Sequence, residues 1–186
     1  MNLLFSVLLR PKLEPGNAQA LTLALGLAVR DVLASRVAVP VGLKWPNDVV
    51  AGGRKLAGVL VETQLQGSQL RAVVAGVGVN VSMRELPEAL RDRATSVALL
   101  GGGELGLEPL LVSLLEAIEL RTEQYTRSGL GPMLPDLLRH DCLRDRAVRV
   151  DDRSGTARGI DMDGALIIED AGGRVHRLRA GTVEIA

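Results

Sequence analysis

The stretch from residue 41 to residue 80 constrains the fold most, because short apolar runs alternate there with proline and glycine. Residues 41–43 predict a short buried strand. It cannot continue through Pro46, since proline has no backbone N–H to donate to a sheet ladder. The pairs at 47–48 and 52–53 are turn signals that separate further apolar runs. The pattern therefore predicts a series of hairpin-connected strands.

Three glycines interrupt these predicted strands, Gly58 in one and Gly76 and Gly78 in the next. Glycine weakens a strand interior, so it often marks a bulge or a place where a ligand approaches the backbone closely. Both interpretations stay open: bulges alone, or a flat floor beneath a ligand. The string G-V-G-V-N is not a dinucleotide-binding fingerprint, because no third glycine is correctly placed and no helix follows directly.

Lysine is rare in this chain and is concentrated in the same stretch. Of the 22 basic residues 19 are arginine, and two of the three lysines are Lys44 and Lys55. An ammonium group is a compact point charge that suits a single phosphate or carboxylate oxygen, whereas arginine presents a flat fork. Either this placement is chance or the stretch needs an ammonium. The predicted hairpin brings Asn47, Asp48 and Lys55 near the ends of adjacent strands.

Composition argues against several classes of function. The formal net charge is zero, so no broad attraction to nucleic acid or to a membrane is expected. With only three aromatic residues, a base-stacking surface for single strands is not expected either. The apolar residues 1–9 are too short to span a membrane and lack the features of a signal peptide. The single cysteine, Cys142, fits a reducing cytosol, and with His140 alone beside it no metal site is predicted.

Periodicity and turn residues predict helices on both sides of these strands in the sequence, followed by a small all-β domain. Helices are predicted at residues 17–36, with Asn17 as the cap, and at 85–91, 108–127 and 132–140. Short strands at the spacing of a small barrel are predicted at residues 147–150, 156–160, 166–168, 175–178 and 183–185. The first long helix is almost entirely apolar, so it is expected to be buried on the sheet. Residues 1–9 are expected to form a central strand.

Three motifs in the 41–80 stretch resemble a known family. They are K-W-P-N-D at residues 44–48, R-K-L-A-G-V-L-V-E at 54–62 and G-V-G-V-N at 76–80. In sequence and spacing they are similar to the catalytic core of bacterial biotin protein ligases. The resemblance extends to residues 2–11, which look like the strand just after the family's biotin-binding loop. The C-terminal residues resemble the family's small barrel.

The resemblance implies an α+β fold: a mixed β-sheet with helices mainly on one face, like a class II synthetase core, followed by a small SH3-like β-barrel. It places a partial catalytic core in residues 1–143 and the small domain in residues 144–186. The family's arginine- and glycine-rich loop over biotin is absent from the sequence, so either the chain is a fragment or its start is assigned too late. We therefore expect at most weak nucleotide binding and poor biotin transfer by the chain alone.

The implied activity is that of a biotin–[acetyl-CoA-carboxylase] ligase, an ATP-dependent enzyme of the cytoplasm. Such an enzyme joins the biotin carboxylate to the α-phosphate of ATP and releases pyrophosphate. It then passes the biotinyl group to a lysine of a biotin carboxyl carrier domain. The expected ligands are biotin and ATP with Mg²⁺, and the expected partner is the carrier domain. Because the missing N-terminal strands should leave part of the sheet exposed, self-association into a homodimer is also expected.

The resemblance also assigns roles to residues of the three motifs. Lys55 would contact the biotin carboxylate and the α-phosphate, and Asp48 and Lys44 are the other catalytic candidates. Asp48 could bind Mg²⁺ through water or help to deprotonate the acceptor lysine, and Lys44 could instead pair with Asp48 structurally. The expected biotin pocket consists of Lys55, Gly58, Leu60, Gly76 and Gly78, and the expected nucleotide contacts are Asn47, Val59, Val79 and Asn80.

Three other functions remain open from the sequence. A lipoate–protein ligase shares the chemistry and a similar fold, although K-W-P-N-D together with K-L-A-G-V-L favours biotin. A biotin-sensing repressor would need a DNA-binding helix pair ahead of the core. A catalytically incomplete remnant would bind nucleotide or biotin weakly, or would pair with another chain.

Overall fold

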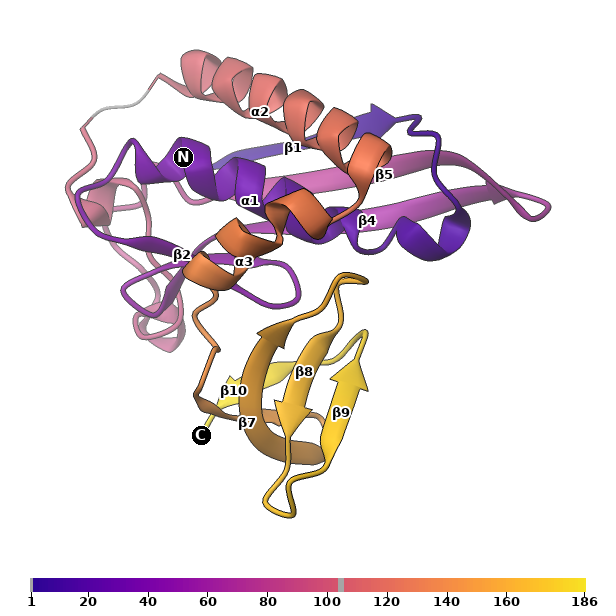
Figure 1. The fold of residues 1–186 in the computed structure, drawn as a ribbon. Helices are drawn as coiled ribbons and strands as arrows, with labels where there is room; N and C mark the ends of the chain where they lie inside the picture. Colours follow the sequence, from indigo (N-terminus) through magenta and orange to yellow (C-terminus); the bar gives the residue numbers. More distant parts are fainter. Residues whose placement is uncertain (1, 104–105) are drawn as a thin grey trace.

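The computed structural model describes residues 2–103 and 106–186, which form two five-stranded sheets with three α-helices (Figure 1). The first part of the chain contains β1 (Leu3–Leu9), η1 (Pro15–Asn17), α1 (Leu21–Ala34), β2 (Val41–Lys44), β3 (Asp48–Ala51), β4 (Arg54–Gln66), β5 (Gln69–Val79), η2 (Glu88–Leu90) and η3 (Ala98–Leu100). The second part contains α2 (Leu107–Ser128), η4 (Gly131–Met133), α3 (Leu134–His140), β6 (Ala147–Val150), β7 (Arg153–Ile160), β8 (Leu166–Glu169), β9 (Val175–Leu178) and β10 (Val183–Ile185).

The larger sheet has the strand order β1-β5-β4-β3-β2, and each of these pairings is antiparallel. The α+β class is confirmed, but the expectation of a mixed sheet is wrong for the described strands. Three of the four pairings join strands that follow each other through a short turn, and a short turn can join only antiparallel neighbours. Gly52 and Gly53 both have positive φ in the β3–β4 turn, a conformation that glycine adopts at little cost.

The first strand, β1, lies at the edge of this sheet and not in its centre, which corrects the prediction from its apolar sequence. It pairs only with β5, and its side chains alternate between the core and the outer face. Leu3 is buried, whereas Leu4 is 76% exposed and Leu8 is 50% exposed. A continuous apolar run predicts burial on both faces, but here one face has no cover among the described residues. Met1 lies outside the described residues.

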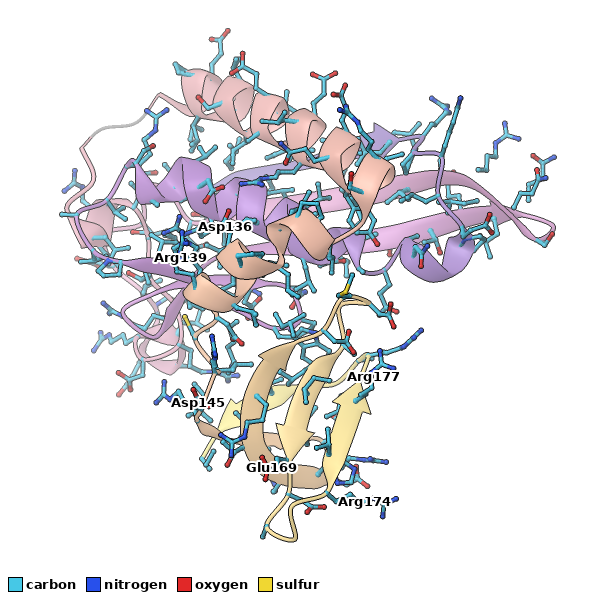
Figure 2. All side chains as sticks on the ribbon, viewed as in Figure 1. Asp136, Arg139, Asp145, Glu169, Arg174 and Arg177 are labelled. Carbon is cyan, nitrogen blue, oxygen red and sulfur yellow. The ribbon has the colours of Figure 1, made fainter. Side chains whose placement is uncertain are left out.

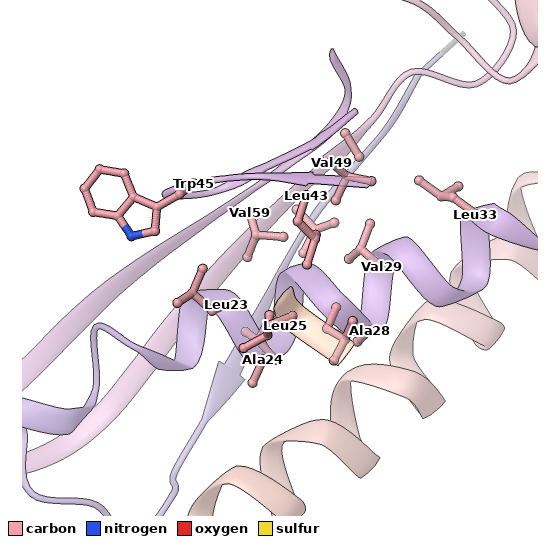
Figure 3. Packing of buried hydrophobic residues seen from close by; sticks show 14 of the residues in the cluster. Leu23, Ala24, Leu25, Ala28, Val29, Leu33, Leu43, Trp45, Val49 and Val59 are labelled. Carbon is pink, nitrogen blue, oxygen red and sulfur yellow. The ribbon is translucent and has the colours of Figure 1, made fainter. Parts of the chain in front are cut away.

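Helix α1 packs on the inner face of the sheet, and α2 packs against α1 (Figure 1). Both helices occur where their apolar periodicity predicts them, and nine residues of α1 are buried. Figure 3 shows Val29 and Leu33 of α1 on the side that faces Leu43 and Val49 of the hairpin. The predicted cap is wrong, because Asn17 ends η1 and α1 begins four residues later without a side-chain cap.

The smaller sheet has the order β10-β6-β7-β8-β9 and is antiparallel throughout. Several of its arginines are paired with carboxylates on the surface. Arg158, for example, donates to Glu169 and to Asp145 at 2.8 and 3.1 Å, and Figure 2 labels these two carboxylate residues. Strand β7 begins at Arg153, earlier than predicted, because the preceding turn is shorter than its polar sequence indicates. None of the helices in the described ranges is long and apolar enough to cross a membrane.

Candidate functional site

A cleft of about 350 Å³ opens on the outer face of the larger sheet, opposite α1. Its floor is the backbone of β4 and β5, where glycines leave the sheet without side chains. The residues that line it are Leu4, Asn47, Lys55, Ala57, Gly58, Val59, Leu60, Gly76, Gly78 and Asn80. Most of the residues singled out from the sequence therefore lie around one cleft.

Three of the predicted site residues are not among those that line the cleft. Val79 is fully buried, so its side chain lies in the core and not in the cleft. Its backbone pairs with the neighbouring strands. Lys44 and Asp48 lie opposite each other on β2 and β3, but the Asp48 carboxylate pairs with Lys55. The structural pair suggested for Lys44 is therefore not the one that forms. No salt bridge of Lys44 occurs among residues 2–103 and 106–186.

Lys55 reaches the cleft because of a bulge between β3 and β4. The register shifts between Val49 and Val50, and the two successive residues Leu56 and Ala57 both point into the core. In a regular strand the positions i and i+3 lie on opposite faces. The extra inward residue puts Lys55 and Gly58 on the same outer face.

The ammonium group of Lys55 is held by Asp48 above a glycine. Lys55 Nζ lies 2.5 Å from Asp48 Oδ1, and the lysine side chain is 48% exposed. A Cβ atom at position 58 would come within 3.0 Å of both Cε and Nζ of Lys55. Gly58 therefore leaves the space that the ammonium occupies. The arrangement presents one cation to an anion that enters the cleft.

A segment that sequence reasoning gave no role, residues 93–98, holds the backbone around Lys55 and Asn80. The Lys55 N–H donates to the Arg93 carbonyl and the Thr95 N–H donates to the Lys55 carbonyl, each at 2.9 Å. Asn80 Nδ2 donates to the same Lys55 carbonyl at 3.3 Å. Because these bonds join β4 to the residues after β5, the segment fixes both sides of the cleft's polar end.

The polar pair Thr95-Ser96 is fully buried in this segment, and the Ser96 side chain anchors it. The Ser96 hydroxyl donates to the Met83 carbonyl at 2.5 Å and accepts the Leu99 N–H at 3.1 Å. Two hydroxyl residues between apolar neighbours are a sequence signal of a buried polar anchor, and this signal could have identified the segment.

A second, narrower crevice of about 140 Å³ lies between the cleft and the smaller sheet. It shares Asn47, Val59 and Leu60 with the cleft. Its far wall is formed by Asp163, Gly164 and Arg179 of the smaller sheet, and its near wall by Trp45, Pro46 and the start of α1. Sequence reasoning did not predict that the two parts of the chain meet beside the site.

The described residues contain no group of three His, Cys, Asp or Glu side chains that could hold a metal ion. Burial raises the pKa of the Cys142 thiol and lowers the pKa of the neighbouring His140. Both effects favour the uncharged forms of these side chains. Asp48 is the carboxylate beside the cleft, and a single carboxylate suits a Mg²⁺ ion that is held mainly by substrate phosphates.

Two family profiles match the chain. One is described as "Biotin/lipoate A/B protein ligase family" and matches residues 1–80, and the other as "Biotin protein ligase C terminal domain" and matches residues 145–185. The bifunctional ligase/repressor BirA of Escherichia coli is 32% identical over 175 residues, covering 92% of this chain and 54% of BirA. The biotin–[acetyl-CoA-carboxylase] ligase of Paracoccus denitrificans is 33% identical over 184 residues, covering 91% of this chain and 74% of that protein.

Among solved structures, the biotin protein ligase of Aquifex aeolicus in complex with biotin and ATP matches with a TM-score of 0.86 and 28% identity. That match covers all of this chain and 79% of the Aquifex chain. The chain spans about half the length of the first curated relatives that it matches, 54% for the Escherichia coli protein.

Proposed function

Since this chain belongs to the biotin protein ligase family, we propose that it activates biotin with ATP and transfers the biotinyl group to a lysine of a carrier domain. The observation that carries the proposal is the cleft itself. Glycines of two neighbouring strands and the ammonium of Lys55 meet there. The Aquifex relative, whose structure holds biotin and ATP, supports the same pair of ligands for this chain.

In the first step, an oxygen of the biotin carboxylate attacks the α-phosphorus of ATP. An O–P bond forms, the bond to the β-phosphate oxygen breaks, and pyrophosphate leaves. Two anions must approach each other, so a fixed cation lowers the barrier most where water is scarce. Lys55 supplies that cation, and it exchanges its Asp48 partner for the carboxylate and phosphate oxygens. Lys44 is a further cation near the site, opposite Asp48 in the pairing of β2 with β3.

The bare glycine floor determines where the two ligands lie. The outer face at Gly58, Gly76 and Gly78, with Leu60 beside it, forms the apolar surface for the biotin rings. Asn47 and Asn80 lie at the polar end, where their amides and the backbone at Val59 and Val79 contact the adenylate. Close backbone approach is possible only because side chains are absent from the floor.

In the second step, the acceptor lysine's amine attacks the acyl carbon, the bond to the phosphate oxygen breaks, and AMP leaves. The amine must lose a proton. Asp48 can accept it once Lys55 has turned to the phosphate. A Mg²⁺ ion would be held by the ATP phosphates with Asp48 as an outer ligand through water, where it would neutralise phosphate charge.

The partner that we propose is the biotin carboxyl carrier domain of a carboxylase, with a cytoplasmic location because the reaction consumes ATP. The ligase activity is favoured over a repressor function because the Paracoccus relative, of which the chain covers 74%, is named a ligase alone. Biotin is favoured over lipoate by the Aquifex complex with biotin and ATP. A homodimer is part of the proposal.

The experiment that tests the function is the release of pyrophosphate from ATP in the presence of biotin, lipoate or neither. In the longest available form of the protein, we expect release with biotin only, followed by incorporation of labelled biotin into a carrier domain. The substitution Lys12→Ala serves as a control, since this third lysine lies beyond β1 and outside the cleft. Release that depends on lipoate would replace this proposal with the lipoate–protein ligase activity.

A further inference from the structure

We propose that a turn of the smaller sheet, residues 161–164, positions the nucleotide end of the cleft by holding Trp45. The inference rests on the proposed function and adds a positioning element that lies outside the cleft. The turn lines the narrow crevice through Asp163 and Gly164, but neither residue lines the cleft itself. Its influence on a bound nucleotide must therefore pass through the residues between them.

The turn keeps its own shape. Oδ1 of Asp161 accepts the N–H groups of Asp163 and Ala165 at 2.9 and 3.0 Å. Oδ2 of Asp161 accepts Arg177 Nε at 2.7 Å, and Arg177 Nη2 also donates to Asp163 at 2.7 Å. A turn fixed by a carboxylate and an arginine acts as a rigid contact surface, because few of its atoms can move independently.

This rigid turn docks on the indole of Trp45. The Gly164 carbonyl accepts Trp45 Nε1–H at 3.0 Å across the two parts of the chain. Trp45 is 3% exposed, and Figure 3 shows it at the end of the apolar cluster beyond Leu23. Gly164 has φ +82°, and a Cβ there would lie 2.9 Å from Ala20 Cβ. Only glycine lets the turn approach the start of α1 this closely.

Trp45 transmits this contact to the cleft along two residues of backbone. The Asn47 carbonyl accepts the Val59 N–H at 2.9 Å, so the loop is held at one end by β4 and at the other by the turn. Asn47 lines both the crevice and the cleft. If the turn withdraws, Trp45 loses its acceptor and Asn47 loses one of its two supports. The glycine floor on β4 and β5 is held by its own ladder and keeps its place.

The chain offers a matched control, because the same turn occurs again in the smaller sheet. Asp170 Oδ1 accepts the N–H groups of Gly172 and Arg174 at 2.9 and 3.0 Å, and Gly173 occupies the position of Gly164. Gly173 has φ +78°, close to that of Gly164, but no atom lies within 4 Å of a Cβ built there. The substitutions Gly164→Ala and Gly173→Ala therefore impose similar backbone strain, and only the first disturbs the docked turn.

The test compares these two variants with the wild-type chain. ATP and biotin affinities are measured by calorimetry, and the exposure of Trp45, the only tryptophan, by acrylamide quenching of its fluorescence. For Gly164→Ala we expect ATP affinity to fall about tenfold, a factor comparable to the loss of one buried hydrogen bond with its packing. In the same variant, acrylamide quenching of Trp45 should rise, and biotin affinity should change less than about twofold. The control Gly173→Ala should match the wild type in ATP affinity, biotin affinity and quenching.

The substitution Trp45→Phe gives a second, independent variant. It keeps a buried ring, removes the N–H donor, and is expected to reproduce the selective loss of ATP affinity. Equal effects of Gly164→Ala and Gly173→Ala, or an equal loss of biotin and ATP affinity, would overturn the positioning role. If the wild-type chain binds neither ligand, the proposed function fails and the coupling to nucleotide fails with it. The difference in acrylamide quenching between Gly164→Ala and Gly173→Ala then still decides whether the turn holds Trp45.

Discussion

At the scale of single residues, one ammonium group depends on the residues that surround it. Asp48 holds Lys55 Nζ at 2.5 Å, and Gly58 leaves the space in which that pair lies. The pair is partly exposed, so its contribution to stability is small, as for other surface ion pairs. The ion pair matters for catalysis because it holds the cation above the glycine floor in advance. Little rearrangement is then needed when an anion binds.

The first prediction concerns this cation. In the longest form of the protein that forms adenylate, Lys55→Ala should lower the rate of biotin-dependent pyrophosphate release by about a hundredfold or more, the range for losing one charged contact to a transition state. Lys55→Arg should not restore the full rate, because a planar fork does not reproduce a point contact. Wild-type release by Lys55→Ala, with Lys12→Ala as the control, would remove Lys55 from the catalytic residues.

The second prediction separates two glycines of the floor. Alanine at position 58 displaces Lys55, whereas alanine at position 76 has no protein atom closer than 3.9 Å to its Cβ. We expect Gly58→Ala to slow adenylate formation about tenfold, and Gly76→Ala to weaken biotin binding about tenfold by narrowing the cleft. Both should unfold in urea within about 1 kcal/mol of the wild type.

Identical kinetic effects of Gly58→Ala and Gly76→Ala would contradict this division between lysine and biotin. The sequence alone left two interpretations of the three strand glycines open, bulges or a floor beneath a ligand, and the structure shows that all three line one cleft. The sequence was not sufficient to predict the partner of Asp48. The bulge at Leu56 and Ala57 decides which lysine faces Asp48, and alternation of apolar and polar residues does not locate a bulge.

At the scale of elements, a side-chain hydrogen bond of Tyr125 connects α2 to the segment before α1. The Tyr125 hydroxyl donates to the Asn17 carbonyl at 2.6 Å, and Tyr125 is buried. Helix α2 itself was predicted within one residue at each end, because its apolar period is regular. The start of α1 was not predicted, since the residue expected as its cap forms η1 and accepts this long-range bond.

The third prediction concerns the tyrosine and pH. Burial, and then the Asp163 carboxylate, raise the pKa of Tyr125 above its ordinary value. The unfolded chain therefore ionises this phenol first, so its share of the stability is intact below about pH 10 and is lost as the pH rises further. Tyr125→Phe should lower the free energy of unfolding by about 1 kcal/mol at neutral pH. It should also reduce the alkaline decline, as measured by urea unfolding.

A pH dependence that stays the same in the wild type and Tyr125→Phe would contradict the assignment of this decline to Tyr125. The comparison must be made between the two chains at each pH, because lysines also titrate in this range. At neutral pH the phenol is not ionised, so the difference in free energy of unfolding between the wild type and Tyr125→Phe tests the hydrogen bond alone.

At the scale of the whole molecule, the outer face and the β1 edge of the larger sheet lack cover among the described residues. Leu4, Leu8 and Leu60 are all at least half exposed there, and β1 pairs on one side only. An open strand edge beside exposed apolar side chains favours pairing with another chain. This exposure was expected from the resemblance, whereas the docking of the smaller sheet on Trp45 was not, because it joins residues 119 positions apart.

The fourth prediction follows from this edge. The chain should associate as its concentration rises, and Leu8→Lys should reduce that association by placing a charge on the outer face of β1. Size-exclusion chromatography over a wide range of concentration measures both. A wild-type chain that stays monomeric throughout would show that the edge is not available for pairing.

The central claim is that the glycine floor of β4 and β5 binds the biotinyl adenylate, and nuclear magnetic resonance tests it most directly. The isotopically labelled chain is titrated with a sulfamoyl analogue of biotinyl-AMP that cannot be hydrolysed, and backbone amide shifts are followed. We expect the amide signals of Gly58, Gly76, Gly78 and Asn80 to move together, while that of Gly173 stays unchanged. Shifts confined to other parts of the chain, with these four signals unmoved at saturation, would contradict the account.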